Sequence, residues 1–194
     1  MRQLKIMAHI SLDGVIQTSG EDGFLYADWT APYRSPAGRD ELLAAHGGAF
    51  DLLLGRRTYD MWSGFWPKAP SSPMADSLNA ATKYVVTHHP ESLEWGPFER
   101  VAPDTIEGIR RIKSQAGPNL VLWGSTTLTS ALLEHGLADE VLLLVYPVLL
   151  GTGKRFFAEG APPRSLELVA TKAMPSGILF NTFKVAGPLN AGLA

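Results

Sequence analysis

Cysteine is absent from this 194-residue chain. The absence excludes disulfide frameworks, thiolate zinc sites and cysteine nucleophiles. An excess of charge of one sign is also absent. The chain has 17 Lys and Arg residues and 19 Asp and Glu residues, which gives a formal net charge of −2. A nucleic-acid partner would need a clustered basic face, so we expect none. With 45% hydrophobic residues the chain can bury a core, which a disordered chain cannot.

Long apolar runs are missing as well. The longest, residues 141–146 continued by 147–150, has about half the length of a membrane span. The apolar stretch at the N-terminus reaches Asp13 too early for a signal peptide and its cleavage site. We therefore expect a cytoplasmic protein without a membrane partner. No repeat, low-complexity tract or shift in composition marks a linker, which predicts one domain over residues 1–194, with its core at about residues 4–184.

Strand and helix patterns alternate along the chain. We expect strands at residues 4–10, 51–54, 83–87, 119–123, 139–144, 166–171 and 178–184. We expect helices at residues 38–50, 56–62, 75–82, 105–116 and 125–135, with loops at 17–38 and 63–73. Strands separated by helices predict an α/β fold with a mainly parallel sheet and helices on both faces. The last two strands, with Pro175, Ser176 and Gly177 between them, predict a C-terminal antiparallel hairpin.

Two of the predicted strands end in a glycine directly before a helix. The segments are Gly55-Arg56-Arg57-Thr58 and Gly124-Ser125-Thr126-Thr127. Amides at a helix N-terminus attract phosphate, a glycine lets it approach, and arginines add forked donors for a phosphate monoester. Ligands of open α/β sheets bind at the carboxyl ends of strands, where both segments fall. The pattern predicts a site for dinucleotide phosphates; ordinary capped turns with solvated arginines are the alternative.

Other nucleotide and nucleophile motifs are missing. No G-x-G-x-x-G follows the first strand, and the segment 151–154 lacks the upstream glycine of a P-loop. No G-x-S-x-G elbow is present. Asp13-Gly14 forms a turn after the first strand that could lie against a flat ring. Gly151 and Gly153 predict a bulge or mobile loop that could close over a substrate.

Six short motifs in this order resemble the dihydrofolate reductase superfamily, and more closely the reductase domain of riboflavin biosynthesis, the RibD C-terminal family. They are S-x-D-G at 11–14, G-R-x-T at 55–58, K-x-V-V-T at 83–87, G-S-x-x-L at 124–128, D-E at 139–140 and P-V-L-L-G-x-G-x-x-F at 147–156. The resemblance covers residues 4 to 184. Each motif is short, and the specificity lies in the ordered set.

The resemblance implies an NADPH-dependent reductase that acts on a small molecule and forms a homodimer. Carried over by position, the adenosine side would be held by Gly55, Arg56, Arg57 and Thr58, with Arg56 or Arg57 at the 2′-phosphate. The adenine ribose would be bordered by Thr87 and His88. The pyrophosphate would be cradled by Gly124, Ser125, Thr126 and Leu128. The nicotinamide would lie near Asp13 and Gly14, with Gly151 and Gly153 along the far wall.

Two hydride transfers fit this pattern. The riboflavin-type reaction acts on 5-amino-6-(5-phosphoribosylamino)uracil, whose phosphate needs a cation; the candidates are Lys154, Arg155 and Arg34. The dihydrofolate-type reaction reduces a C=N bond and needs a carboxyl group, for which the candidates are Asp28 and Asp13. Trp29 is the tryptophan we expect to stack on a flat substrate.

Two departures from the family pattern narrow the prediction. Gly124-Ser125 stands where dihydrofolate reductases have Gly-Gly joined by an unusual peptide bond, and the cis or trans state stays open. The H-x-E and P-C-x-x-C signatures of a zinc deaminase are absent, so no metal site is expected and the chain cannot deaminate. A protein that binds NADPH without turnover, or an unrelated hydrolase or transferase with phosphate-binding turns, are the other interpretations.

Overall fold

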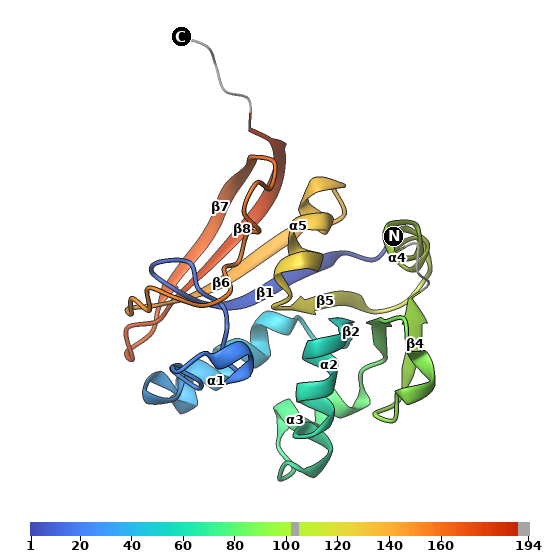
Figure 1. Cartoon of the computed structure of the whole chain (residues 1–194), viewed down its shortest axis with the longest axis horizontal. Helices are drawn as coiled ribbons and strands as arrows, with labels where there is room; N and C mark the ends of the chain where they lie inside the picture. Colours follow the sequence, from blue (N-terminus) through green and yellow to red (C-terminus); the bar gives the residue numbers. More distant parts are fainter. Residues whose placement is uncertain (102–104, 190–194) are drawn as a thin grey trace.

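The computed structural model describes residues 1–101 and 105–189 (Figure 1). Within these residues eight strands form one sheet, in the order β4-β3-β2-β5-β1-β6-β8-β7. The strands are β1 (Leu4–Ser11), β2 (Phe50–Gly55), β3 (Lys83–Val86), β4 (Phe98–Val101), β5 (Asn119–Trp123), β6 (Glu140–Tyr146), β7 (Arg164–Ala173) and β8 (Leu179–Pro188). The helices are α1 (Pro36–His46), α2 (Arg56–Ser63), α3 (Pro73–Ala80), α4 (Thr105–Ser114) and α5 (Thr126–Glu134). Short 3₁₀ turns are η1 (Glu21–Gly23), η2 (Ala31–Tyr33), η3 (Trp66–Lys68) and η4 (Pro90–Ser92).

The sheet is parallel from β4 to β6 and antiparallel beyond it. β1 pairs in parallel with both β5 and β6, and β2 pairs in parallel with β5 and β3. β8 runs antiparallel to β6 and to β7, so β7 is the outer strand of the predicted hairpin. The expected mainly parallel sheet with a C-terminal antiparallel hairpin is confirmed, and the carboxyl ends of β2, β5, β1 and β6 meet at one edge.

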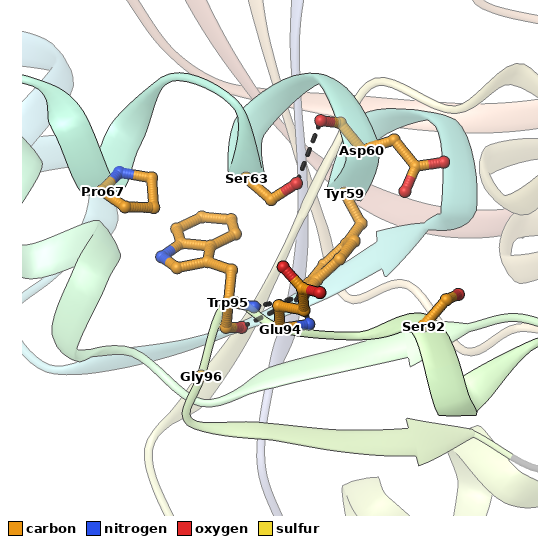
Figure 2. A pocket seen from close by; sticks show the side chains of 8 residues that line it. All are labelled: Tyr59, Asp60, Ser63, Pro67, Ser92, Glu94, Trp95 and Gly96. Carbon is orange, nitrogen blue, oxygen red and sulfur yellow. Dashed lines mark hydrogen bonds between the residues drawn. The ribbon is translucent and has the colours of Figure 1, made fainter.

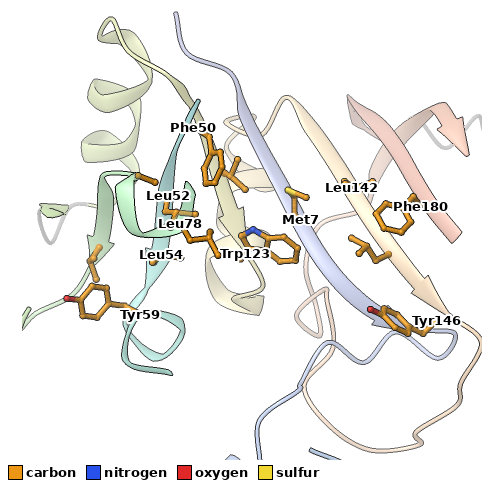
Figure 3. Packing of buried hydrophobic residues seen from close by; sticks show 14 of the residues in the cluster. Met7, Phe50, Leu52, Leu54, Tyr59, Leu78, Trp123, Leu142, Tyr146 and Phe180 are labelled. Carbon is orange, nitrogen blue, oxygen red and sulfur yellow. The ribbon is translucent and has the colours of Figure 1, made fainter. Parts of the chain in front are cut away.

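Each face of the sheet has its own hydrophobic core. Alternate residues of β1 divide between the faces, with Ile6 and Ala8 in one core and Met7 in the other. The core that includes Met7 is covered by α1, α2 and α3, which lie together below the sheet in Figure 1; Figure 3 shows its members Met7, Trp123 and Tyr146. The opposite core receives apolar side chains from α4 and α5. Helices on both faces, as predicted, leave the carboxyl edge of the sheet to the loops.

The structure moves several predicted boundaries by one to four residues, most clearly at the end of α1. The helix expected over residues 38–50 ends at His46, because Gly47 and Gly48 adopt left-handed φ angles of 79° and 89°. Phe50 instead begins β2. The sequence analysis also missed β4, a short edge strand in which only Val101 is buried, so that its pattern carries no apolar signal. Among the described helices, none has the length and apolar character needed to cross a membrane.

Lys83 of the K-x-V-V-T strand is fully buried beneath the segment that follows β3. Its Nζ donates to the backbone oxygens of Asn79 at 2.6 Å and Gly96 at 3.2 Å, and lies 4.3 Å from the ring centroid of Trp95. Burial lowers the pKa of Lys83 to about 8, and the charge of Asp51 opposes that shift. The charged amine is therefore held by carbonyls and a ring rather than by water.

We expect Lys83 to make stability depend on pH in the alkaline range. Between pH 8 and 10.5 the unfolded chain keeps this proton while the folded one releases it, so stability should rise by up to about 3 kcal/mol. Lys83→Met should lose that rise, measured by urea unfolding at pH 8 and pH 10. The exposed Lys172→Met is the control and should keep it. Parallel pH profiles for wild type and Lys83→Met would contradict the prediction.

Candidate functional site

The two predicted phosphate turns lie in contact. Gly55 ends β2, Ser125 follows β5, and these strands are parallel neighbours. A Cβ atom added to Gly55 would lie 3.0 Å from Oγ of Ser125 and 3.6 Å from its Cβ. Glycine at position 55 therefore permits the close approach, and segments 70 residues apart in the chain come together at one edge of the sheet.

Neither helix at this edge has a side-chain cap. Gly55 is the N-cap of α2, and Ser125, the N-cap of α5, makes no side-chain hydrogen bond to the first-turn amides. Ser125 has φ 60° and ψ 81°, and Gly124 has φ 60°. A non-glycine residue in this region is strained, and such strain is found at functional sites. Among described residues the cis peptide bond is Gly96-Pro97, so the Gly124-Ser125 bond is trans.

Arg56 connects the start of α2 to the end of β3. Its Nε donates to both carboxylate oxygens of Asp60, at 2.8 and 2.9 Å. Its Nη1 donates to Oγ of Ser92 at 2.7 Å, to the backbone oxygen of His89 at 3.0 Å and to Oγ1 of Thr87 at 3.3 Å. The structure therefore brings together Arg56 and Thr87, two of the residues predicted for the adenosine side. His88, also predicted there, is exposed.

Arg57 and Lys154 share one carboxylate. Oδ2 of Asp22 lies 3.2 Å from Nη1 of Arg57 and 2.6 Å from Nζ of Lys154. The hydrogen bond and charge of Lys154, followed by the charge of Arg57, lower the pKa of Asp22. This cluster draws the loop after β1, the start of α2 and the glycine-rich segment 151–154 to the same place. It links two motifs that the sequence analysis assigned to cofactor and to substrate.

Asp13 anchors the glycine-rich segment to the end of β1. Its Oδ1 accepts from Oγ of Ser11 at 2.6 Å and from the amide of Leu150 at 3.1 Å, and its Oδ2 accepts from the amide of Gly151 at 2.7 Å. The Ser11 hydroxyl first, and then these amides, lower the pKa of Asp13 to about 2. The carboxyl group is thus ionised at neutral pH, which suits a positioning role better than proton donation.

A second connection joins α5 to the same segment. Oγ1 of Thr126 donates to the backbone oxygen of Arg155 at 2.6 Å. The guanidinium of Arg155 donates to the backbone oxygen of Asp13, beside Gly14. Through Arg155, these two bonds connect the start of α5 to the loop after β1.

Gly153 lies where no side chain fits. Its φ is 116°, and an added Cβ would be 2.6 Å from Cγ1 of Val15 and 2.9 Å from Cε2 of Phe24. Gly151, with φ 75°, has no atom within 4 Å of such a Cβ. The two glycines therefore serve different needs: close packing at 153 and backbone conformation at 151.

Three predicted residues are placed differently from the roles suggested for them. Asp28 is exposed and pairs with Arg34, also exposed. Trp29 is buried, with its Nε1 donating to the backbone oxygen of Gln17 at 2.7 Å and its ring 5.0 Å from that of Tyr146. Leu128 is buried in the core beneath α5, and its Cδ1 would lie 3.5 Å from a Cβ added to Gly55, so its side chain packs against the Gly55 turn. Thr58 is half-buried on α2.

Sequence reasoning missed His9, which lies near the carboxyl end of the central strand. Its Nδ1 is 2.8 Å from Oη of Tyr146, and its ring centroid is 5.3 Å from that of Trp123. The signal was present, since His9 interrupts an apolar strand pattern two residues before the S-x-D-G motif. Burial first, and Arg34 second, lower the pKa of His9 to about 4.

A hollow of about 340 Å³ lies beside α2 (Figure 2). It is lined by Tyr59, Asp60, Ser63, Pro67, Ser92, Glu94, Trp95 and Gly96. Oη of Tyr59 accepts from the amides of Glu94 at 2.9 Å and Trp95 at 2.6 Å, which holds the wall against the helix. Two lining residues, Asp60 and Ser92, also bind Arg56. In the described part of the chain, no group of three or more His, Asp and Glu could hold a metal ion.

Comparison with known proteins decides the family. The family described as the RibD C-terminal domain matches residues 2–180. This chain belongs to the RibD C-terminal domain family. A curated protein of similar sequence is the uncharacterized protein YyaP of Bacillus subtilis (strain 168), 26% identical over 132 residues, which are 66% of this chain and 70% of that protein.

Solved structures show the same fold at low sequence identity. A putative riboflavin biosynthesis protein from Shewanella sp. PV-4 superposes with a TM-score of 0.71 at 20% identity, over 94% of this chain and 98% of the other. Dihydrofolate reductase from Enterococcus faecalis, solved as a complex with NADP(H), gives a TM-score of 0.62 at 16% identity, over 95% and 96%. This member of the RibD C-terminal domain family therefore has a dihydrofolate-reductase-like fold, as the ordered motifs implied.

Gly153→Ala should destabilise the fold by about 3 kcal/mol, because the methyl group adds overlap with Val15 and Phe24 to the left-handed strain. Gly160→Ala is the matched control, since its φ is 76° but an added Cβ meets no atom within 4 Å. It should cost about 1 kcal/mol, from backbone strain alone. Urea unfolding measures both changes. Equal losses would show that the contacts of Gly153 do not constrain it.

Proposed function

We propose that this protein is an NADPH-dependent reductase that transfers a hydride to a small heterocyclic or ribosylated substrate, as in the reduction of 5-amino-6-(5-phosphoribosylamino)uracil. The observation that carries the proposal is the contact between the Gly55 and Ser125 turns, each at the uncapped start of a helix. Amides at helix N-termini favour phosphate, and two converging sets suit a pyrophosphate. Membership of the RibD C-terminal domain family supports the same conclusion.

The residues present fit the parts of such a cofactor. The amides that begin α2 and α5, with the hydroxyls of Ser125 and Thr126, would hold the pyrophosphate. Arg56, beside Thr87, and the exposed Arg57 would meet the 2′-phosphate. The end of β1 at Asp13 and Gly14 would border the nicotinamide.

The cofactor supplies the hydride, and the chain supplies position and exclusion of water. Asp13 holds the segment that begins at Gly151 against the end of β1, so this segment can form the far wall of the substrate site. Lys154, Arg155 and Arg34 are cations that could take a substrate phosphate. Two of them already pair with carboxylates, Lys154 with Asp22 and Arg34 with Asp28, which an incoming phosphate would have to displace.

A dihydrofolate-type reaction is the second candidate. It needs a carboxyl group that can supply a proton, and the lowered pKa of Asp13 disfavours that residue. Asp28 is exposed and paired with Arg34. We therefore place the ribosylated substrate first.

We also propose a homodimer, formed through the outer strand of the hairpin. β7 is at the edge of the sheet, and its Leu168 and Val169 are 57% and 62% exposed. Exposed apolar residues on an edge strand favour association with a second copy. Sedimentation should show a dimer for the wild type and a shift to monomer for Val169→Lys. A monomeric wild type would refute the dimer without bearing on the reductase.

NADPH and NADH titrations, followed by nicotinamide fluorescence, test the cofactor assignment. Loss of a charged hydrogen bond to the 2′-phosphate should weaken NADPH binding about 10- to 100-fold in Arg56→Ala or Arg57→Ala and leave NADH binding unchanged. Arg110→Ala is the control. This exposed arginine lies on α4, which covers the face of the sheet opposite to α2, where Arg56 and Arg57 lie.

Comparing NADPH with NADH shows whether Arg56 binds the 2′-phosphate or only holds the protein structure. If Arg56→Ala weakened both equally, Arg56 would act by holding the 87–92 segment rather than by selecting NADPH. No binding of either nucleotide by the wild type would refute the reductase proposal. Turnover of the ribosylated substrate but not of dihydrofolate would support the ranking of the ribosylated substrate before dihydrofolate.

A further inference from the structure

His9 occupies the centre of an aromatic group at the carboxyl edge of the sheet. Its strand, β1, is flanked by β5, which ends at Trp123, and by β6, which ends at Tyr146. The ring of His9 lies 5.3 Å from Trp123 and 5.6 Å from Tyr146. The rings of Trp29 and Tyr33 also meet that of Tyr146 edge-on, with centroids at 5.0 and 5.6 Å. Trp123 directly precedes the Gly124-Ser125 turn, and His9 precedes Ser11 and Asp13, so this group lies between the parts of the proposed cofactor site assigned to the pyrophosphate and to the nicotinamide.

The hydrogen bond between His9 and Tyr146 determines where the imidazole proton lies. Tyr146 is buried, and within the described residues Nδ1 of His9, at 2.8 Å, is the partner of its hydroxyl. If Nδ1–H donated to the phenol oxygen, the phenol proton would be buried without an acceptor, which is costly. The phenol O–H therefore donates to Nδ1. In a neutral imidazole the single ring proton is then on Nε2.

Nε2 of His9 is accessible and has no partner in the part of the chain that the structure describes. The buried side-chain nitrogens and oxygens without a partner there are Nε of Arg164 and Oγ of Ser176. Nε2 is not among them, and His9 is partly exposed. Nε2 of His9 therefore keeps some exposure to solvent and has no acceptor among residues 1–101 and 105–189.

Both members of the pair are neutral near pH 7. Burial, with the charge of Arg34 second, lowers the pKa of His9 to about 4, and burial raises the pKa of Tyr146 to about 12 against the opposing charge of Arg34. The groups that face the pair are Arg34 and Tyr33 from the loop before α1, while His46 of α1 contacts the other side of Trp123. Arg34 is the nearby cation, and its presence opposes an imidazolium.

We propose that Nε2–H of His9 donates the hydrogen bond that holds the acceptor atom of a planar substrate, a ring carbonyl oxygen or imine nitrogen, and that Tyr146 is a positioning residue that fixes this tautomer. The proposal rests on the proposed reductase function for the identity of the ligand as substrate. His9 keeps its proton, because passing it on through the pair would leave a buried tyrosinate. Trp123, beside His9, and Tyr33, beside Tyr146, provide the aromatic surroundings that suit a heterocycle.

Nitrogen-15 NMR of histidine-labelled protein tests the tautomer without any ligand. His9→Gln identifies the His9 signals among the five histidines. At pH 7 we expect a proton on Nε2, none on Nδ1, and no titration above pH 5. Tyr146→Phe should raise the fraction of the Nδ1–H form, because the donor to Nδ1 is lost. An imidazolium at pH 7, or a wild-type Nδ1–H tautomer, would overturn the proposal.

Ligand binding tests the donor. The probes are 6-aminouracil, dihydrofolate and 5-amino-6-(5-phosphoribosylamino)uracil, each added with NADP⁺ so that no reduction occurs. We expect at least one probe to shift the Nε2 signal of His9. His9→Leu should weaken that probe about two- to tenfold, the value of one neutral hydrogen bond, and His9→Gln, whose amide N–H can donate, should retain most of the affinity.

Separate outcomes refute this proposal and the proposed function. A protein that binds NADP⁺ but whose His9 signal no probe moves, or whose His9→Leu variant binds the probe as tightly as wild type, overturns the role of His9 and leaves the reductase standing. A protein that binds neither nucleotide overturns the reductase. Circular dichroism spectra and urea-unfolding midpoints close to those of the wild type show that His9→Leu and Tyr146→Phe remain folded.

Discussion

The parallel pairing of β5 with both β1 and β2 is the constraint on which the remaining geometry depends. Because these strands run in the same direction, the Gly55 turn, the Gly124-Ser125 turn and the loop that begins at Ser11 all open at one edge of the sheet. Gly55 then allows the first two turns to touch. Two helix N-termini and the end of the central strand become one surface, although they come from distant parts of the chain.

Polar contacts hold the loops of this surface in place. Asp13 fastens the segment at Gly151, Thr126 binds the backbone of Arg155, and Asp22 bridges Arg57 and Lys154. Each contact joins a cofactor motif to a substrate motif of the sequence analysis. A ligand that moved one loop would therefore disturb the others, so under the proposed function substrate binding and cofactor binding would be coupled.

Local patterns in the sequence predicted most of the fold. Apolar runs predicted the buried strands β1, β2, β3, β5 and β6, and their alternation with helices predicted the parallel sheet. The pattern failed at β4, because an exposed edge strand with one buried residue has no apolar periodicity. It failed at the end of α1, because the two glycines after His46 stop the helix before the apolar Phe50.

The sequence by itself determined the two glycine turns at Gly55 and Gly124, since a glycine at a strand end and arginines at a helix start act through local backbone geometry and charge. The tertiary structure decided how the candidate acids and aromatic residues are placed. Asp13 binds the amide of Gly151 and Trp29 binds the backbone oxygen of Gln17, and both partners are more than ten residues away in the chain. The hydrogen bond from Tyr146, 137 residues away, leaves the ring proton of His9 on Nε2, and no local sequence pattern predicts the position of such a partner.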